Sequence, residues 1–204
     1  MKGICFKEPL FRKTVQGVKT QTRRIVAFPR NAYGGLQAQS QDGVIVRILA
    51  LDEHERSWRK DGSEWLMKPK YKLGEILYLK EPYAEMPFGG YDYAFDPKTI
   101  GLPWKNKLFM PASAARYFIK ITGVRAERLQ DITEEDCFRE GIQDCDYGGM
   151  QCVIYGLEKG LFFEELGTTP IKAYAALIDK INGKGTWDSN PFVWVYDYEM
   201  TNND

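Results

Sequence analysis

The stretch Gly17-Val18-Lys19-Thr20-Gln21-Thr22-Arg23-Arg24 places a glycine, a lysine, a threonine and an arginine at fixed offsets, in the pattern G-x-K-x-x-T-x-R. A short amphipathic helix is predicted before this octet, with Pro9 in its first turn. Gly17 suits the left-handed backbone position just past a helix end. The chain therefore turns sharply here, and Lys19 is presented from a loop.

The residues that follow this turn read as a strand from Thr20 to Val26. Side chains alternate along a strand, so Thr22 and Arg24 are expected on one face. Lys19 joins that face only if the turn bends toward it. The candidate site therefore depends on the geometry of a single turn.

Positive charge is concentrated in the first 30 residues, which hold eight basic side chains and one acid, Glu8. The whole chain is neutral, with 28 basic and 28 acidic residues. Segregated charge attracts phosphate locally, whereas a neutral total argues against wrapping of nucleic acid over the whole surface. We expect a local anion site; the alternative is solvated surface charge balanced by acids elsewhere.

Length and composition predict one domain over residues 1–204, because 44% hydrophobic and 14% aromatic residues can form a substantial core. No apolar run is long enough to span a bilayer, and the first residues lack the apolar centre of a secretory signal, so a cytoplasmic protein is expected. The four cysteines form no C-x-x-C pair, and the only histidine, His54, lies far from them. We expect reduced thiols, no metal and no cofactor; the alternative is a metal shared by Cys145 and Cys152.

Hydrophobic patterns and turn residues predict the remaining elements. Gly123 in the middle of one long strand suits a bulge or bend, and Thr133 suits the N-cap of a short helix. The predicted strands cover 3–6, 44–51, 76–81, 116–129 and 192–198, the predicted helices cover 134–141 and 170–181, and turns are expected at 33–35 and 42–43.

Several separate blocks of this chain resemble the ASCH domain family, a relative of the PUA RNA-binding domain. The blocks are the octet, the strand GEILYLKE at 74–81, the stretch ERLQDITEEDCFREGI at 127–142 and the stretch WDSNPFVWVYDYE at 187–199. The strand fits the pattern G-[DE]-x-[LI]-x-[VL]-x-E, which is typical of ASCH and PUA-like barrels. The last two blocks resemble the longer ASCH proteins, many of them encoded by phages and prophages. Residues 31–70, 86–102 and 143–167 remain as insertions.

The resemblance implies an α+β fold, a PUA-like mixed β-barrel with flanking helices, and a cleft beside the octet that binds RNA, a nucleoside or a nucleotide. Basic side chains would hold phosphates and aromatic rings would stack on bases. For Arg24 the alternative is an ion pair with a barrel acid such as Glu81. The expected ligand-binding residues are Arg23, Arg24, Glu81, Tyr83 and Trp104, with Trp58 as a further aromatic candidate.

Small ASCH proteins that act as amidohydrolases on acetylated cytidine suggest a second function. By motif position, the resemblance implies that Lys19, Thr22 and Glu140 are catalytic. A threonine hydroxyl becomes a good nucleophile when a nearby base, such as a deprotonated lysine, takes its proton. Burial and the charges of Arg23 and Arg24 would lower the pKa of Lys19, whereas Glu140 would raise it.

Each member of this triad has a purely structural alternative. Lys19 can interact with the last carbonyls of the helix, Thr22 is ordinary in a strand, and Glu140 can be a solvated helix residue. Two further functions remain open: a ribonuclease, and a phage accessory protein that binds a host protein through its insertions.

Overall fold

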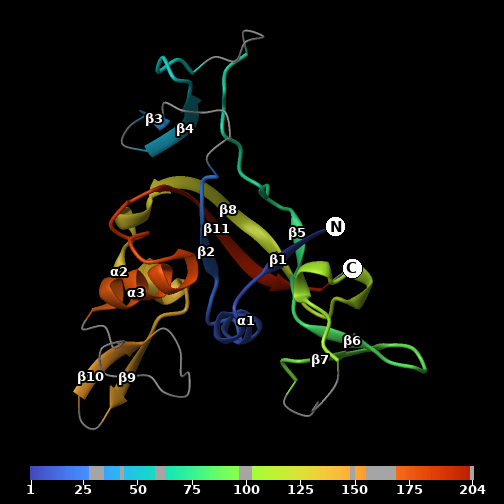
Figure 1. Cartoon of the computed structure of the whole chain (residues 1–204). Coiled ribbons are helices and arrows are strands. Elements are labelled where there is room, and N and C mark those ends of the chain that lie inside the picture. The colour runs from blue at the N-terminus through green and yellow to red at the C-terminus, as the bar shows by residue number, and fades with distance from the viewer. Residues whose placement is uncertain are drawn as a thin grey trace.

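The computed structural model describes residues 1–27, 35–41, 44–57, 63–96, 103–147, 150–154 and 169–202. Within these ranges the chain forms eleven strands and three α-helices, together with three short 3-10 turns (Figure 1). The strands are β1 (Lys2–Cys5), β2 (Gln21–Ile25), β3 (Gly35–Gln41), β4 (Val44–Leu51), β5 (Ile76–Lys80), β6 (Tyr83–Glu85), β7 (Tyr91–Tyr93), β8 (Phe118–Arg128), β9 (Gln143–Tyr147), β10 (Met150–Ile154) and β11 (Phe192–Thr201). The helices are α1 (Glu8–Val15), α2 (Glu134–Arg139) and α3 (Pro170–Asn182).

A mixed sheet of seven strands forms the centre of the molecule. Five of them follow the order β1-β5-β8-β11-β2, and β4 joins β3 to β8. The β1–β5 pair is parallel, whereas the other pairs in this sheet are antiparallel. The expected mixed α+β architecture is therefore present.

The sheet is mostly open in the part of the chain that the structure describes. β1 and β2 are the two ends of the strand order, and within the described ranges no backbone pairing between them closes the sheet into the expected barrel. The unpaired edges of β1 and β2 matter for the site described below.

The longest strands, β8 and β11, carry the predicted bulge. Their register shifts where Asp197 pairs with Gly123 and Tyr198 pairs with Ile121. A Cβ atom on Gly123 would lie 2.6 Å from Oδ2 of Asp197, so a larger residue would displace that carboxylate. The glycine thus lets Asp197 stay close to the sheet, where Arg125 and Arg139 bind it.

The three helices begin and end largely where the sequence predicts. Gly17 follows α1 with a left-handed φ of 74°. The Thr133 side chain caps α2 by accepting a hydrogen bond from the backbone N–H of Asp136. α2 ends at Arg139, two residues before the predicted end, and Gly141 takes a φ of 100° just beyond it. α3 extends the predicted helix by one residue, to Asn182.

Three hairpins lie at the periphery of the molecule in Figure 1: β3–β4, which belongs to the seven-stranded sheet, and β6–β7 and β9–β10, which are separate two-stranded sheets. They fall in or next to the three predicted insertions. In the β9–β10 pair, Cys145 and Cys152 are backbone partners in register. The expected turn at 42–43, residues 33–34 of the expected turn at 33–35, and Trp58 lie outside the described residues, whereas Gly35 begins β3.

The main core lies between the sheet and the three helices. Sheet residues such as Leu79, Ile119 and Val195 pack with Phe11 of α1 and Leu177 of α3. Burial of this amphipathic set is the dominant stabilising contribution expected for such a domain. Among the described helices, none is both long and apolar enough to cross a membrane.

Candidate ligand-binding cleft

The turn after α1 brings the octet against the end of α2. The backbone N–H of Thr20 donates to the carbonyl of Arg139 at 2.9 Å, which places the next residue, Glu140, beside Lys19. Together these segments line a cavity of about 190 Å³, here called the octet cavity. Its lining includes five residues predicted for the site: Lys19, Thr22, Arg23, Arg24 and Glu140.

Lys19 is the most enclosed of these residues, with 1% of its surface exposed. Its ammonium lies 2.5 Å from Oε2 of Glu140, 2.6 Å from the carbonyl of Gln21 and 2.9 Å from the carbonyl of Glu140. Burial lowers the pKa of Lys19 from its ordinary value, and Glu140 opposes that effect. The three protons of a charged ammonium would each have an acceptor, so the site holds Lys19 firmly in place.

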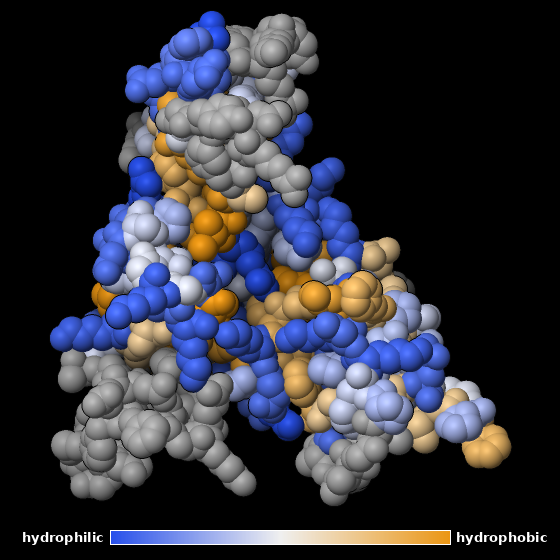
Figure 2. Space-filling model, viewed as in Figure 1, coloured by the Kyte–Doolittle hydropathy of each residue, from blue (hydrophilic) through white to orange (hydrophobic). Residues whose placement is uncertain are grey.

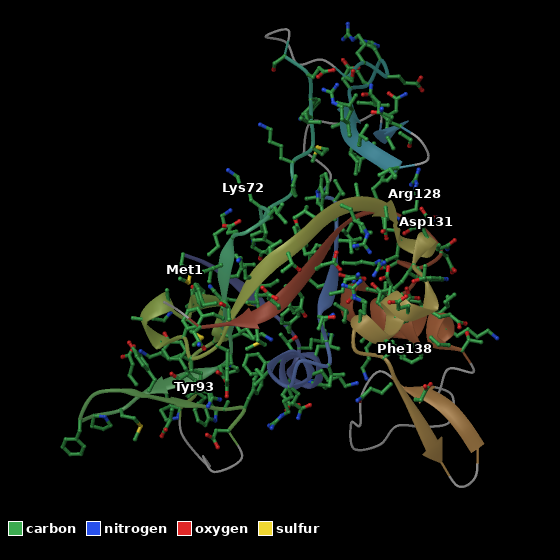
Figure 3. All side chains as sticks on the ribbon, turned by 180° about the vertical axis from the view of Figure 1, so that it is seen from behind. Met1, Lys72, Tyr93, Arg128, Asp131 and Phe138 are labelled. Carbon is green, nitrogen blue, oxygen red and sulfur yellow. The ribbon has the colours of Figure 1, made fainter. Side chains whose placement is uncertain are left out.

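Arg23 takes part in a buried ion-pair network. Its Nη2 lies 2.7 Å from Asp136 and 3.0 Å from Glu127, and its Nη1 lies 3.4 Å from Glu140. Arg125 also binds Asp136, and the carboxylate of Asp197 links Arg125 to Arg139. In Figure 3, nitrogen and oxygen tips gather between the sheet and α2. The terminal nitrogens of Arg23 are therefore already engaged within the protein.

Arg24 has a different environment, although it is the adjacent residue. Its Nη2 donates to the carbonyl of Cys5 at 2.9 Å, and its guanidinium lies 5.4 Å from the ring centre of Phe6. This single side chain links β2 to β1, the two ends of the strand order. The alternative ion pair between Arg24 and Glu81 is wrong, because Glu81 is buried and binds Arg116 through both carboxylate oxygens, at 2.7 and 2.9 Å.

Three of the expected ligand-binding residues lie away from the octet cavity. Glu81 is held by Arg116, and Tyr83 is buried in a small cluster with Met110 and Ala114. Trp104 is half-buried and lines neither the octet cavity nor the cavity described next. The structure therefore does not bring these three side chains to Lys19.

A second cavity of about 440 Å³ adjoins the octet cavity and shares Cys5, Arg24 and Ile25 with it. We call it the aromatic cavity. Its lining includes the rings of Tyr71, Trp194 and Tyr196 and the basic residues Arg24, Lys68, Lys70 and Lys80.

Most residues that line the aromatic cavity were not predicted from the sequence. Tyr71 precedes β5, and Trp194 and Tyr196 belong to β11, so these rings come together only through pairing between distant segments. The spacing of Trp194 and Tyr196, two residues apart on one strand, was the only local signal that both rings share a face. Trp194 packs against the core and also lines this cavity.

The basic side chains of the aromatic cavity lack acidic partners among the described residues. In the part of the chain that the structure describes, no acidic residue lines this cavity. Among the described residues, none of the four basic side chains forms a salt bridge, and Lys80 donates only to the neutral carbonyl of Leu108. Figure 2 shows a hollow near the middle of the face turned toward the viewer, where hydrophilic atoms lie between hydrophobic ones. Such a surface attracts anions that also carry an apolar face.

No group of three or more histidine, cysteine, aspartate or glutamate side chains in the described part of the chain is arranged to hold a metal ion. Comparisons with protein-family models, with curated proteins and with solved structures found no match. The resemblance to the ASCH family therefore rests on the sequence blocks alone.

Proposed function

We propose that this chain binds a nucleotide or single-stranded RNA across the octet and aromatic cavities, as an ASCH-type protein. The observation that carries the proposal is the aromatic cavity, where basic side chains without salt bridges lie beside three aromatic rings. Phosphates require positive charge, and nucleobases stack on aromatic rings. Few other classes of ligand need both groups in one cavity.

The distribution of charge supports a local site over a broad nucleic-acid surface. The chain as a whole has a formal net charge of zero, yet among the described residues that line the two cavities Glu140 is the only acid. Lys19 neutralises that carboxylate at 2.5 Å. Arg23 is engaged in its buried network, but the basic lining residues other than Lys19 and Arg23 form no salt bridge among the described residues, so their charge can act on a ligand.

The arrangement of the sheet is consistent with a PUA-like barrel that is incomplete between β1 and β2. Both cavities are lined by residues of these two strands, and Arg24 bridges them through the carbonyl of Cys5. In this proposal the ligand lies at the junction of the two strands, where the barrel of the family would close. The octet would then border the ligand, as the family resemblance implies.

The test is the binding of a fluorescently labelled single-stranded RNA, measured over a range of salt concentrations. Lys70→Gln removes one exposed charge from the aromatic cavity and is expected to weaken binding, with a smaller dependence of log K on log salt by about 0.7. Lys120→Gln is the matched control, because Lys120 is exposed on β8 and lines neither cavity. Equal loss in both variants would show that the cavity is not the binding site.

A second candidate function, an amidohydrolase acting on acylated cytidine-type nucleosides, is favoured by one specific observation. Lys19, Thr22 and Glu140 come from two distant segments and line the same cavity. The lowered pKa of Lys19 has the direction that a general base requires. Against this, its three acceptors favour the protonated ammonium, so Lys19 would have to lose a proton to Glu140 or to solvent before it could activate Thr22.

This second function is tested by the release of acetate from a panel of acylated cytidines. Thr22→Val is the informative variant, because it removes the proposed nucleophile and keeps the shape of a β-branched residue in β2. The expected result for a hydrolase is turnover by the wild type and none by the variant, with unchanged unfolding midpoints. Turnover that survives in Thr22→Val would exclude this residue as the nucleophile.

A further inference from the structure

Three buried donors in the described residues have no hydrogen-bond partner: Nε of Arg23, Nε of Arg24 and the hydroxyl of Tyr174. All three residues line the octet cavity. A buried polar group without a partner is costly, and folded proteins leave few of them. Their gathering at one cavity indicates that a group rich in acceptor atoms completes it.

Tyr174 is the most informative of the three, because nothing in the octet pattern points to it. It lies on α3, is 1% exposed, and packs its ring edge-on against Trp187 with a centroid distance of 6.3 Å. Burial keeps the pKa of Tyr174 well above its ordinary value, so the hydroxyl keeps its proton and can donate it. The nearby carboxylate of Glu140 is engaged by Lys19 instead.

The charges around the octet cavity favour an anionic acceptor over a neutral one. Lys7 and Lys107 line it, and each donates to a backbone carbonyl, with no salt bridge among the described residues. Burial lowers the pKa of Lys107, and the positive charges of Lys7 and Arg24 act in the same direction. Cations that destabilise one another in this way would be stabilised by a bound anion.

We propose that the octet cavity is the subsite for a phosphate group, with the Tyr174 hydroxyl donating to a phosphate oxygen, and that the attached nucleoside occupies the aromatic cavity. Arg24 is shared by the two cavities and would lie at the junction of phosphate and nucleoside. The inference rests on the proposed function and adds to it a phosphate subsite and a residue of α3 that selects for it. The phosphate can belong to a free mononucleotide or to an RNA chain.

The experiment compares the affinities of the four nucleoside 5′-monophosphates, the four nucleosides, and a tetranucleotide RNA with and without a 5′-phosphate. Wild type, Tyr174→Phe and Tyr93→Phe are measured by calorimetry, and their stabilities by urea unfolding. Tyr93→Phe is the matched control, because its hydroxyl lies away from both cavities and donates to the carbonyl of Ala114 at 2.7 Å.

The proposal predicts opposite behaviour for the two variants. Tyr174→Phe should weaken binding of the phosphorylated ligand by about 10- to 100-fold, the equivalent of one hydrogen bond to a charged group. It should not lower stability, because the hydroxyl has no hydrogen-bond partner among the described residues. Tyr93→Phe should lower stability and leave binding unchanged. A monophosphate that binds more tightly than its nucleoside identifies a terminal phosphate. If Tyr174→Phe binds RNA more weakly than the wild type, but the 5′-phosphate does not change the affinity for the tetranucleotide, the subsite holds an internal phosphate. That result also supports the subsite.

Two results would overturn the inference, and they are distinguishable. If ligands bind but Tyr174→Phe binds them as tightly as the wild type, the phosphate subsite is wrong and the proposed function stands. If no nucleotide and no RNA binds to the wild type, the proposed function fails and the subsite fails with it.

Discussion

Replacement of Lys19 by methionine should be among the most damaging single substitutions in this domain. Methionine retains an unbranched apolar chain but removes the charge that lies 2.5 Å from Oε2 of Glu140. The carboxylate would keep only the distant contact with Arg23 at 3.4 Å, and the carbonyls of Gln21 and Glu140 would each lose a donor. Breaking a buried pair in this way costs about 3–5 kcal/mol, a large part of the about 5–15 kcal/mol that stabilises a typical domain.

The assay is equilibrium unfolding in urea, followed by tryptophan fluorescence, with the slope m compared among variants. Lys2→Met is the control, because the Lys2–Glu75 pair is an ion pair whose lysine side chain is 48% exposed, and its loss should cost at most about 1 kcal/mol. The double variant Lys19→Met/Glu140→Gln should recover part of the loss, since it no longer leaves a buried charge unpaired.

A buried Lys19–Glu140 pair is ruled out if Lys19→Met and Lys2→Met lose the same small amount of stability. That outcome would mean that Lys19 and Glu140 are solvated independently and that the octet is not anchored to the end of α2. A large loss for Lys19→Met also affects tests of catalysis, because the inactivity of an unfolded Lys19 variant says nothing about its chemistry. Thr22→Val is therefore the better test of the hydrolase function.

Three further predictions concern local features of the structure. Burial and the nearby charge of Lys19 lower the pKa of Lys13 from 10.5 to about 8. Above pH 8 the unfolded chain therefore binds more protons than the folded one, and the free energy of unfolding should rise from pH 8 toward pH 9. Lys13→Met should flatten that rise in urea titrations. Burial raises the pKa of the Cys137 thiol to about 12. In a variant whose two β9–β10 cysteines are replaced by serine, a thiol reagent should label Cys5, which lines both cavities, and should leave Cys137 unlabelled until the protein unfolds. Thr133→Ala removes the N-cap of α2 and should lower stability by about 1 kcal/mol in the same unfolding assay; an unchanged midpoint would contradict the cap.

Local sequence signals predicted most elements of this fold. The strand at 44–51 and the start of α3 at Pro170 agree with the structure, and the cap at Thr133 is present. These signals act between residues a few positions apart, through hydrophobic periodicity, capping hydrogen bonds and the conformational freedom of glycine. They need no knowledge of the rest of the chain, so they can be recognised in the sequence.

The candidate site was only partly predictable. The octet pattern and the family resemblance selected Lys19, Thr22 and Glu140, and the structure places all three around one cavity. The same reasoning expected Tyr83 and Trp104 in the cleft, although their rings lie elsewhere. Aromatic residues occur both in cores and in binding sites, and composition alone does not distinguish these roles.

The sequence by itself determined the turn at Gly17, the alternation along the strand that follows it and the concentration of positive charge in the first 30 residues. Only the tertiary structure decided that Arg23 is engaged in a buried ion-pair network, whereas Arg24 bridges β2 to β1. It also decided that Tyr174 would reach the octet cavity from a helix about 150 residues away along the chain. The physical reason is that burial and ion pairing depend on contacts across sheets and helices, and the free energy of such contacts is not contained in any local stretch of sequence.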